Sequence, residues 1–310
     1  MSEKRLNIAW MYPDTLYLHG ERGNIMALVR YAMELGLKPH VRRIDLGSSG
    51  FDPMDYDILF YGPGEISSFR AVMDDIGTYK RTIAEYIASD RILISTGATT
   101  AMFGEKITRF SPDAEDGIGD VMEGLCVIPA EATEREYIFG DDLDIRAEYA
   151  GYSMELIGNQ IHMADIQFSE SGQYKRFGTV IYGRGNNGAD GMEGVVHGNS
   201  IFTNMLGPML VGNPWLTLKI IRTAAEIDML SDDFNSEYTQ MYAMIEGELS
   251  SCWKGEDSEA FRGKVGDMKH FFDTMRQAIS DYASFLRNTA NAHEARMEDS
   301  RAQADQNCCF

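Results

Sequence analysis

Two short stretches decide the fold: Asp57-Ile-Leu-Phe-Tyr-Gly-Pro-Gly-Glu65 and Arg91-Ile-Leu-Ile-Ser-Thr-Gly-Ala-Thr-Thr100. Each contains an apolar run without polar alternation, and glycine follows the run within one or two residues. A run of this kind is typical of a strand that is buried on both faces of a sheet. The glycine after it permits a sharp turn. We therefore predict that residues 57–61 and 91–95 form two central strands of a parallel sheet.

The flanking sequence supports the same sheet. Residues 6–11 form another apolar run, and residues 39–45 alternate as a strand does. Residues 24–36 have apolar positions at helical spacing and end in glycine, and residues 73–89 are also predicted to be helical. Strands that alternate with helices indicate an α/β fold with a mostly parallel sheet.

The residue pattern of the sequence changes twice further along the chain. Beyond about residue 105 the predicted strands are shorter and rich in glycine, as in 178–198, which favours an antiparallel extension of the same domain. After Pro214 the pattern is helical. Residues 227–249 and 261–286 carry apolar positions at steps of three and four, which predicts an all-α antiparallel helical hairpin. We place the domains at 1–222 and 223–310, the latter with a disordered tail.

Composition excludes several classes of function. The chain has 310 residues and a formal net charge of −20, without a basic stripe, so we expect no nucleic-acid partner. Its four cysteines are too few and too unevenly spaced for a disulfide framework or a zinc site, which favours a reducing cytoplasm. No apolar run reaches the ~20 residues of a membrane span. We expect no metal and no cofactor.

Four segments, in the same order, resemble a known family. Residues 12–28 (YPDTLYLHGERGNIMAL), 62–65 (GPGE), 183–195 (GRGNNGADGMEGV) and 206–214 (LGPMLVGNP) are similar to motifs of the GatD subunits. These subunits are CobB/CobQ-like class I glutamine amidotransferases. The resemblance covers about residues 6–222 and implies a flavodoxin-like α/β domain that hydrolyses glutamine.

The resemblance also implies that two catalytic residues of the family are missing. The family uses a cysteine on a sharp strand-to-helix turn and a histidine that keeps its thiol deprotonated. The resemblance places Thr96 at the cysteine and Leu206 at the histidine, immediately before Gly207-Pro208. It also implies an oxyanion or ligand loop. The candidate residues of this loop are Gly62, Gly64, Gly97 and Ala98. Glycines after buried strands have a simpler interpretation as turn residues.

Three other residues are possible substitutes for the missing catalytic cysteine and histidine. His197 and His162 are the nearest histidines in the sequence, but each is interpreted as structural or surface-exposed. Cys126, flanked by aliphatic residues, is interpreted as a small core residue.

A few residues are candidates for ligand contacts. Arg135 or Arg146 is a candidate for the arginine that holds the glutamine carboxylate in the family, although a solvated surface charge is the preferred interpretation. Asn186 and Asn187 lie in a loop that can contact a ligand or form the plain tip of a hairpin.

The C-terminal segment has a second resemblance. Residues 250–261 (SSCWKGEDSEAF) place Trp253 and Gly255 between two heptad helices, similar to the WXG-type hairpins of type VII secretion. This resemblance implies a homodimer or heterodimer through the hairpin. The segment 292–299 has His293 where the export signal has tyrosine, which counts against secretion.

Three functions follow from these observations. The favoured one is an inactive amidotransferase-like scaffold or regulatory subunit, with a MurT-like ligase of cell-wall precursor amidation as its partner. The alternatives are a functional glutaminase subunit that uses non-standard residues, and a WXG protein related to type VII secretion.

Overall fold

The computed structural model describes residues 5–169, 174–225 and 264. The chain divides into two units, Met1–Ala225 and Glu226–Phe310, and the elements below all lie in the first. The predicted hairpin, with Trp253 and Gly255, lies outside the described residues. The predicted dimer interface and export segment lie outside them too, so both stay predictions.

The first half of the unit alternates strands and helices. Its elements are β1 (Arg5–Met11), η1 (Leu18–Gly20), α1 (Arg22–Glu34), β2 (Lys38–Ile44), η2 (Pro53–Asp55), β3 (Ile58–Tyr61), η3 (Ile66–Ser68), α2 (Phe69–Ile76), η4 (Gly77–Tyr79), α3 (Lys80–Ala88), β4 (Ile92–Thr96) and η5 (Gly97–Phe103).

The second half is rich in strands. Its elements are β5 (Lys106–Phe110), β6 (Ile118–Glu123), β7 (Ala130–Tyr149), β8 (Tyr152–Phe168), β9 (Lys175–Tyr182), β10 (Met192–His197), β11 (Ser200–Thr203), α4 (Met209–Gly212) and α5 (Pro214–Ala225).

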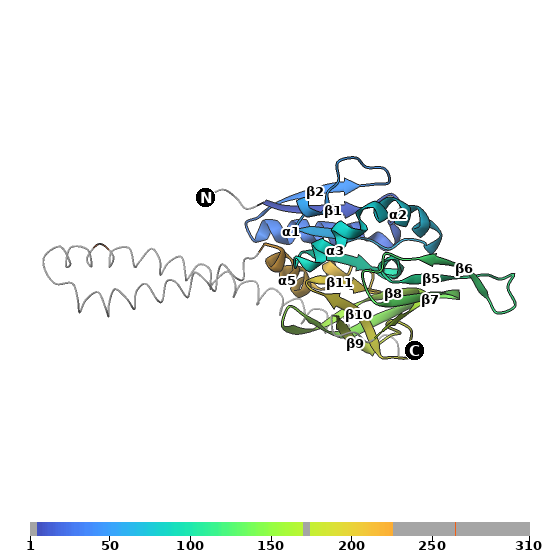
Figure 1. Cartoon of the computed structure of the whole chain (residues 1–310). Helices are drawn as coiled ribbons and strands as arrows, with labels where there is room; N and C mark the ends of the chain where they lie inside the picture. The colour runs from blue at the N-terminus through green and yellow to red at the C-terminus, as the bar shows by residue number, and fades with distance from the viewer. Residues whose placement is uncertain (1–4, 170–173, 226–263, 265–310) are drawn as a thin grey trace, which may run out of the picture. The chain divides into compact units, whose positions relative to one another are not determined.

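One sheet runs through the unit in the order β2-β1-β3-β4-β11-β10-β9-β7-β5-β6, and β8 pairs with β7 (Figure 1). The part from β2 to β11 is parallel throughout. From β11 onward the pairs are antiparallel except β5 with β7. The predicted α/β fold with a parallel sheet and an antiparallel extension is therefore confirmed.

Burial in the core explains the apolar runs in the stretches 57–65 and 91–100. Every residue of β3 and of β4 is buried, which is why neither strand shows polar alternation. The ring of Phe103 packs edge-on against Tyr61 at 5.0 Å and against Phe202 at 5.3 Å. Burial of an aromatic side chain of this size contributes about 1.5–3 kcal/mol. The core thus fixes the end of β4 and the turn that follows it.

Two details differ from the sequence predictions. The predicted helix 73–89 is split into α2 and α3 by η4, which begins at Gly77, a weak helix former. The prediction of only short strands beyond residue 105 is wrong, because β7 and β8 have 20 and 17 residues. The middle of β7 is exposed on every residue from 136 to 142, so its sequence lacks the alternation that marks a half-buried strand.

Among the described residues, no helix is long and apolar enough to cross a membrane.

Candidate functional site

The turn at the end of β4 is the centre of the candidate site. Thr96 ends the strand with extended backbone (φ −119°, ψ 147°), and Gly97 takes the left-handed region at φ +63°. A Cβ atom at Gly97 would lie 2.7 Å from Cδ2 of Leu206 and 2.8 Å from Cβ of Pro63. The residue that faces position 206 is therefore Gly97, and apolar side chains close the space beside it.

Thr96 faces the other way, into the protein. Its side chain is fully buried, and its hydroxyl lies 3.3 Å from Oε2 of Glu21 and 3.4 Å from the carbonyl oxygen of Tyr61. A hydroxyl has one proton, so it donates to one of these acceptors at a time. Thr96 thus has a carboxyl group as its neighbour, although no solvent reaches it.

Glu21 was not found by sequence reasoning. It precedes α1, is 2% exposed, and its Oε2 accepts a hydrogen bond from the side chain of Asn24. Oε1 has no hydrogen-bond partner among the described residues. Burial raises the pKa of Glu21 to about 7, against the lowering effect of the neighbouring Gly207 N–H, Thr96 and Asn24. A carboxyl group that titrates near neutral pH therefore lies beside the turn.

Asn24 ties this carboxyl group to the segment that follows Leu206. Its Oδ1 accepts a hydrogen bond of 2.8 Å from the backbone N–H of Leu210, while its amide group donates to Glu21. Glu21 and Leu210 are 189 residues apart in the chain, so no local pattern in the sequence connects them.

Leu206 lies opposite the turn and is buried at 2% exposure. Its backbone exchanges two hydrogen bonds with Asn159 of β8, at 2.7 and 3.2 Å. Gly207 follows at φ +80°, and a Cβ there would lie 2.2 Å from Oδ1 of Asn159, so only glycine fits. These contacts hold position 206 facing Gly97.

An open cleft of about 640 Å³ adjoins Leu206. Its other lining residues come from η1, β7, β8 and the turn before α4. They are His19, Gly140, Asp141, Asp142, Asn159, Gln160, Ile161 and Gly207. The charged groups in this lining are carboxylates, and no lysine or arginine is among them. The cleft therefore offers little to the carboxylate of a free amino acid.

The predicted ligand loop is already engaged in internal hydrogen bonds. The N–H of Gly64 donates to Oγ1 of Thr99 at 3.1 Å, and that hydroxyl donates to the carbonyl oxygen of Gly62 at 2.8 Å. A Cβ at Gly64 would lie 2.4 Å from the side chain of Leu16. Gly62 and Gly64 thus join the turn after β3 to η5, where Ala98 is also buried.

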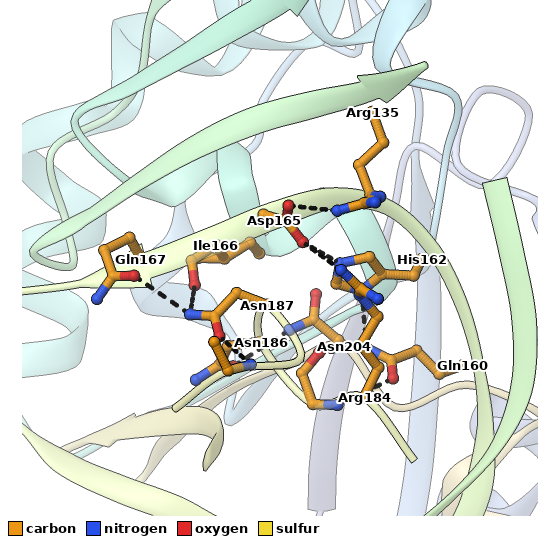
Figure 2. Close-up of polar contacts among 12 residues, drawn as sticks. Arg135, Gln160, His162, Asp165, Ile166, Gln167, Arg184, Asn186, Asn187 and Asn204 are labelled. Atoms are coloured by element: carbon orange, nitrogen blue, oxygen red, sulfur yellow. Dashed lines mark hydrogen bonds and ion pairs between the residues drawn. The ribbon is translucent and has the colours of Figure 1, made fainter. Parts of the chain in front are cut away.

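The three predicted ligand contacts lie in another cluster (Figure 2). Arg135 binds Asp165 through Nη1 at 2.5 Å, so its charge is already paired. Asn186 accepts hydrogen bonds from Gly194 N–H and the Asn204 amide, and Asn187 accepts from the backbone N–H groups of Ala189 and Asp190. None of the three lines the cleft beside Leu206.

The possible substitutes for the lost pair also lie elsewhere. His162 is buried between Asp165 and Gln160, and burial is the main reason that its pKa is lowered. His197 packs edge-on against Tyr174 at 4.6 Å. The interpretation of Cys126 as a core residue is wrong, because its side chain is exposed on a turn with φ +52°.

The chain is similar in sequence to two curated proteins of the same name. The chain is 27% identical over 249 residues to the GatD subunit of lipid II isoglutaminyl synthase (glutamine-hydrolyzing) from Streptococcus pneumoniae, covering 76% of this chain and 92% of that protein. It is 25% identical over 224 residues to the Staphylococcus aureus subunit of the same name, covering 71% and 85%. No family model matches.

Solved structures with a similar arrangement were also found. A glutamine amidotransferase from Methylobacillus flagellatus has a TM-score of 0.41 at 12% identity, covering 70% of this chain and 76% of its own. The glutaminase domain of the Trypanosoma brucei CTPS has a TM-score of 0.40 at 10% identity, covering 71% and 94%.

The N-terminal unit is an α/β domain with a mostly parallel sheet, and the chain is similar to two GatD subunits. The similarity to both GatD subunits covers most of this unit.

Proposed function

We propose that this chain is a catalytically silent GatD-like subunit that binds a MurT-like ligase of cell-wall precursor amidation. One observation carries the proposal. At the turn where a glutaminase of this class has its nucleophile, the chain presents Gly97 against Leu206. Neither residue can attack a carbonyl carbon or move a proton.

The backbone favours Gly97 over Thr96 as the residue at the nucleophile position. A nucleophile on a sharp strand-to-helix turn sits at the strained apex of that turn. Gly97 has the left-handed φ, and its Cβ direction points at position 206, whereas Thr96 is extended and points at Glu21. We therefore assign the lost cysteine to Gly97, one residue later than the sequence suggested.

One observation favours the alternative, a glutaminase with non-standard residues. Thr96 and Glu21 form a hydroxyl–carboxyl pair 3.3 Å apart, and Glu21 has a pKa of about 7, which suits a general base near neutral pH. Against it, Thr96 is fully buried and is not among the residues that line the Leu206 cleft, so no substrate reaches its hydroxyl. Loss of a nucleophile or its base typically costs ~10⁴–10⁶-fold in kcat.

The partner is inferred from the relatives. Their name describes a glutamine-hydrolysing subunit of lipid II isoglutaminyl synthase, which implies a second subunit for the synthase step. A silent subunit that keeps the same domain would occupy or regulate that ligase without delivering ammonia. The type VII secretion alternative depends on the hairpin outside the described residues and stays a prediction.

Ammonia release from glutamine tests the proposal. The full chain is assayed alone and with the ligase, beside Thr96→Ala and Glu21→Gln. We expect the same background rate from all of them. A rate above background that either substitution abolishes would establish the Thr96–Glu21 alternative instead.

A further inference from the structure

A second pocket lies between the end of β8, the start of β9, β10 and the loop 184–191. Its volume is about 430 Å³, which is within the range of small-molecule binding sites. None of its lining residues lines the cleft beside Leu206, so the two are separate. We call it the β9 pocket.

Part of the lining of the β9 pocket is apolar. The residues that supply this part are Pro129, Phe168, Met192 and Val195. Val195 is buried in the main core of the unit, and Phe168 packs against that core, so this part of the wall is firmly held. An apolar and aromatic wall favours a ligand with an apolar body.

Asn186 brings a hydrogen-bond donor to the pocket. Its side chain is only 1% exposed, and its Oδ1 accepts hydrogen bonds from Gly194 N–H at 2.7 Å and from the Asn204 amide at 3.3 Å (Figure 2). The backbone N–H of Gly194 needs an acceptor, which fixes this end of the amide as the oxygen. The Nδ2 at the other end donates to no residue that the structure describes. A buried donor without an acceptor is costly, so a ligand that accepts this bond is stabilised.

Positive charge in the lining comes from Lys175 and Arg176. Arg176 is exposed and lies directly opposite Val195 in the pairing of β9 with β10. Opposite residues of an antiparallel pair have their side chains on the same face of the sheet. Because Val195 lines the pocket, the Arg176 side chain lies on the face that contains it. Within the described part of the chain, neither cation forms an ion pair.

The carboxylate in the lining is already engaged by its own loop. The two oxygens of Asp190 accept hydrogen bonds from Met192 N–H and from the Asn187 amide, at 2.8 Å each. The donors that remain for a ligand are therefore cationic or amide groups. The chain as a whole has a formal net charge of −20, so an anion binds only where the local groups favour it.

We propose that the β9 pocket binds a small molecule that carries a carboxylate or a phosphate group beside an apolar body. Arg176 and Nδ2 of Asn186 hold the anionic oxygens, because guanidinium and amide N–H groups donate to them. The apolar lining covers the body of the ligand. This site does not depend on the proposed function of the domain.

Isothermal titration calorimetry of the full chain at low ionic strength tests the site with four probes. Phenyl phosphate and phenylacetate carry the two anionic groups on the same ring, benzylamine carries a cation on that ring, and inorganic phosphate lacks the ring. We expect saturable binding of at least one of the two aromatic anions. Inorganic phosphate is expected to bind more weakly than phenyl phosphate, and benzylamine is expected not to bind.

Two variants locate the binding. Arg176→Gln should weaken it at least about tenfold, because a hydrogen bond between charged groups is lost. Asn186→Asp keeps the oxygen that Gly194 requires but replaces the donor with an acceptor, so it should weaken binding as well. Arg81→Gln in α3 is the matched control, since that side chain is 92% exposed and lies outside the pocket lining, and it should bind as the parent does. Circular dichroism checks that the variants fold.

The side-chain amide of Asn186 gives a readout in the parent chain. Its NMR signal, identified by its loss in Asn186→Asp, should shift on titration with the bound probe. No saturable binding of either aromatic anion would overturn the site, and so would parent affinity in either pocket variant. Binding of benzylamine at the affinity of the anions would overturn the assignment of ligand charge. Equal affinity for inorganic phosphate and phenyl phosphate would overturn the role of the apolar lining.

Discussion

Protonation of Glu21 should make the stability of the domain depend on pH, and Glu21→Gln should remove that dependence. Burial raises the pKa of Glu21 from 4.5 to about 7, so the folded state holds this proton more tightly than the unfolded state does. For an acid with a raised pKa, the stabilisation is complete below the unfolded value and is lost as the pH rises to the folded value. The relevant window is therefore pH 4.5 to 7.

The expected magnitude follows from the same shift. Within this window, each pH unit changes the free energy of unfolding by about 1.4 kcal/mol, so the two units from pH 5 to pH 7 change it by about 3 kcal/mol. Glutamine keeps an acceptor for Asn24 and Thr96 but carries no charge. The free energy of unfolding of Glu21→Gln, taken relative to that of the parent, should thus be about 3 kcal/mol more favourable at pH 8 than at pH 5.

Urea unfolding of the full chain measures this difference. Trp10 and Trp215 report on the described unit if Trp253 is replaced by phenylalanine in every variant. Glu148→Gln, at an exposed position, is the control for replacing a carboxyl group by an amide. If Glu21→Gln changes stability equally at pH 5 and pH 8, Glu21 does not titrate in this window and the reasoning about its burial is refuted.

Three further predictions concern the same region. Glu193 is fully buried and its pKa is also about 7, so Glu193→Gln should show the same sign of pH dependence in urea unfolding; a flat difference would contradict it. Gly97→Ala should lower the free energy of unfolding by roughly 1–3 kcal/mol, because position 97 has a left-handed backbone. The added methyl group should also clash with Leu206, and Leu206→Ala should relieve this clash. Additive effects of the two substitutions in a double-mutant cycle would rule out that contact. Asn24→Ala should destabilise by about 1–3 kcal/mol, because it leaves Leu210 N–H unpaired; an unchanged unfolding midpoint would show that this bond is dispensable.

The sequence predicted the parallel half of the sheet because its strands are buried on both faces. β3 and β4 lie within one residue of the predicted 57–61 and 91–95, and α1 begins two residues before the predicted helix. Buried parallel strands leave a continuous apolar run, which is readable without knowledge of any neighbour. The exposed middle of β7, residues 136–142, was missed because its residues carry no such signal.

The site was predicted only in part, because its contacts join distant parts of the chain. Leu206 is assigned to the histidine position from the motif before Gly207-Pro208, and this assignment stays a prediction; its side chain lies beside Gly97. Glu21 was invisible because its partner Thr96 is 75 residues away. The choice between Thr96 and Gly97 depends on a backbone angle, and the sequence alone does not determine which of two adjacent residues takes it.

The central claim, a glutaminase scaffold without its chemistry, is tested most directly by ammonia release from glutamine in the presence of the ligase. A silent scaffold should give a background rate for the parent chain, the same rate for Thr96→Ala, and a rise above background for Gly97→Cys/Leu206→His that exceeds any for Thr96→Cys/Leu206→His. A parent rate above background that Thr96→Ala or Glu21→Gln abolishes would contradict it.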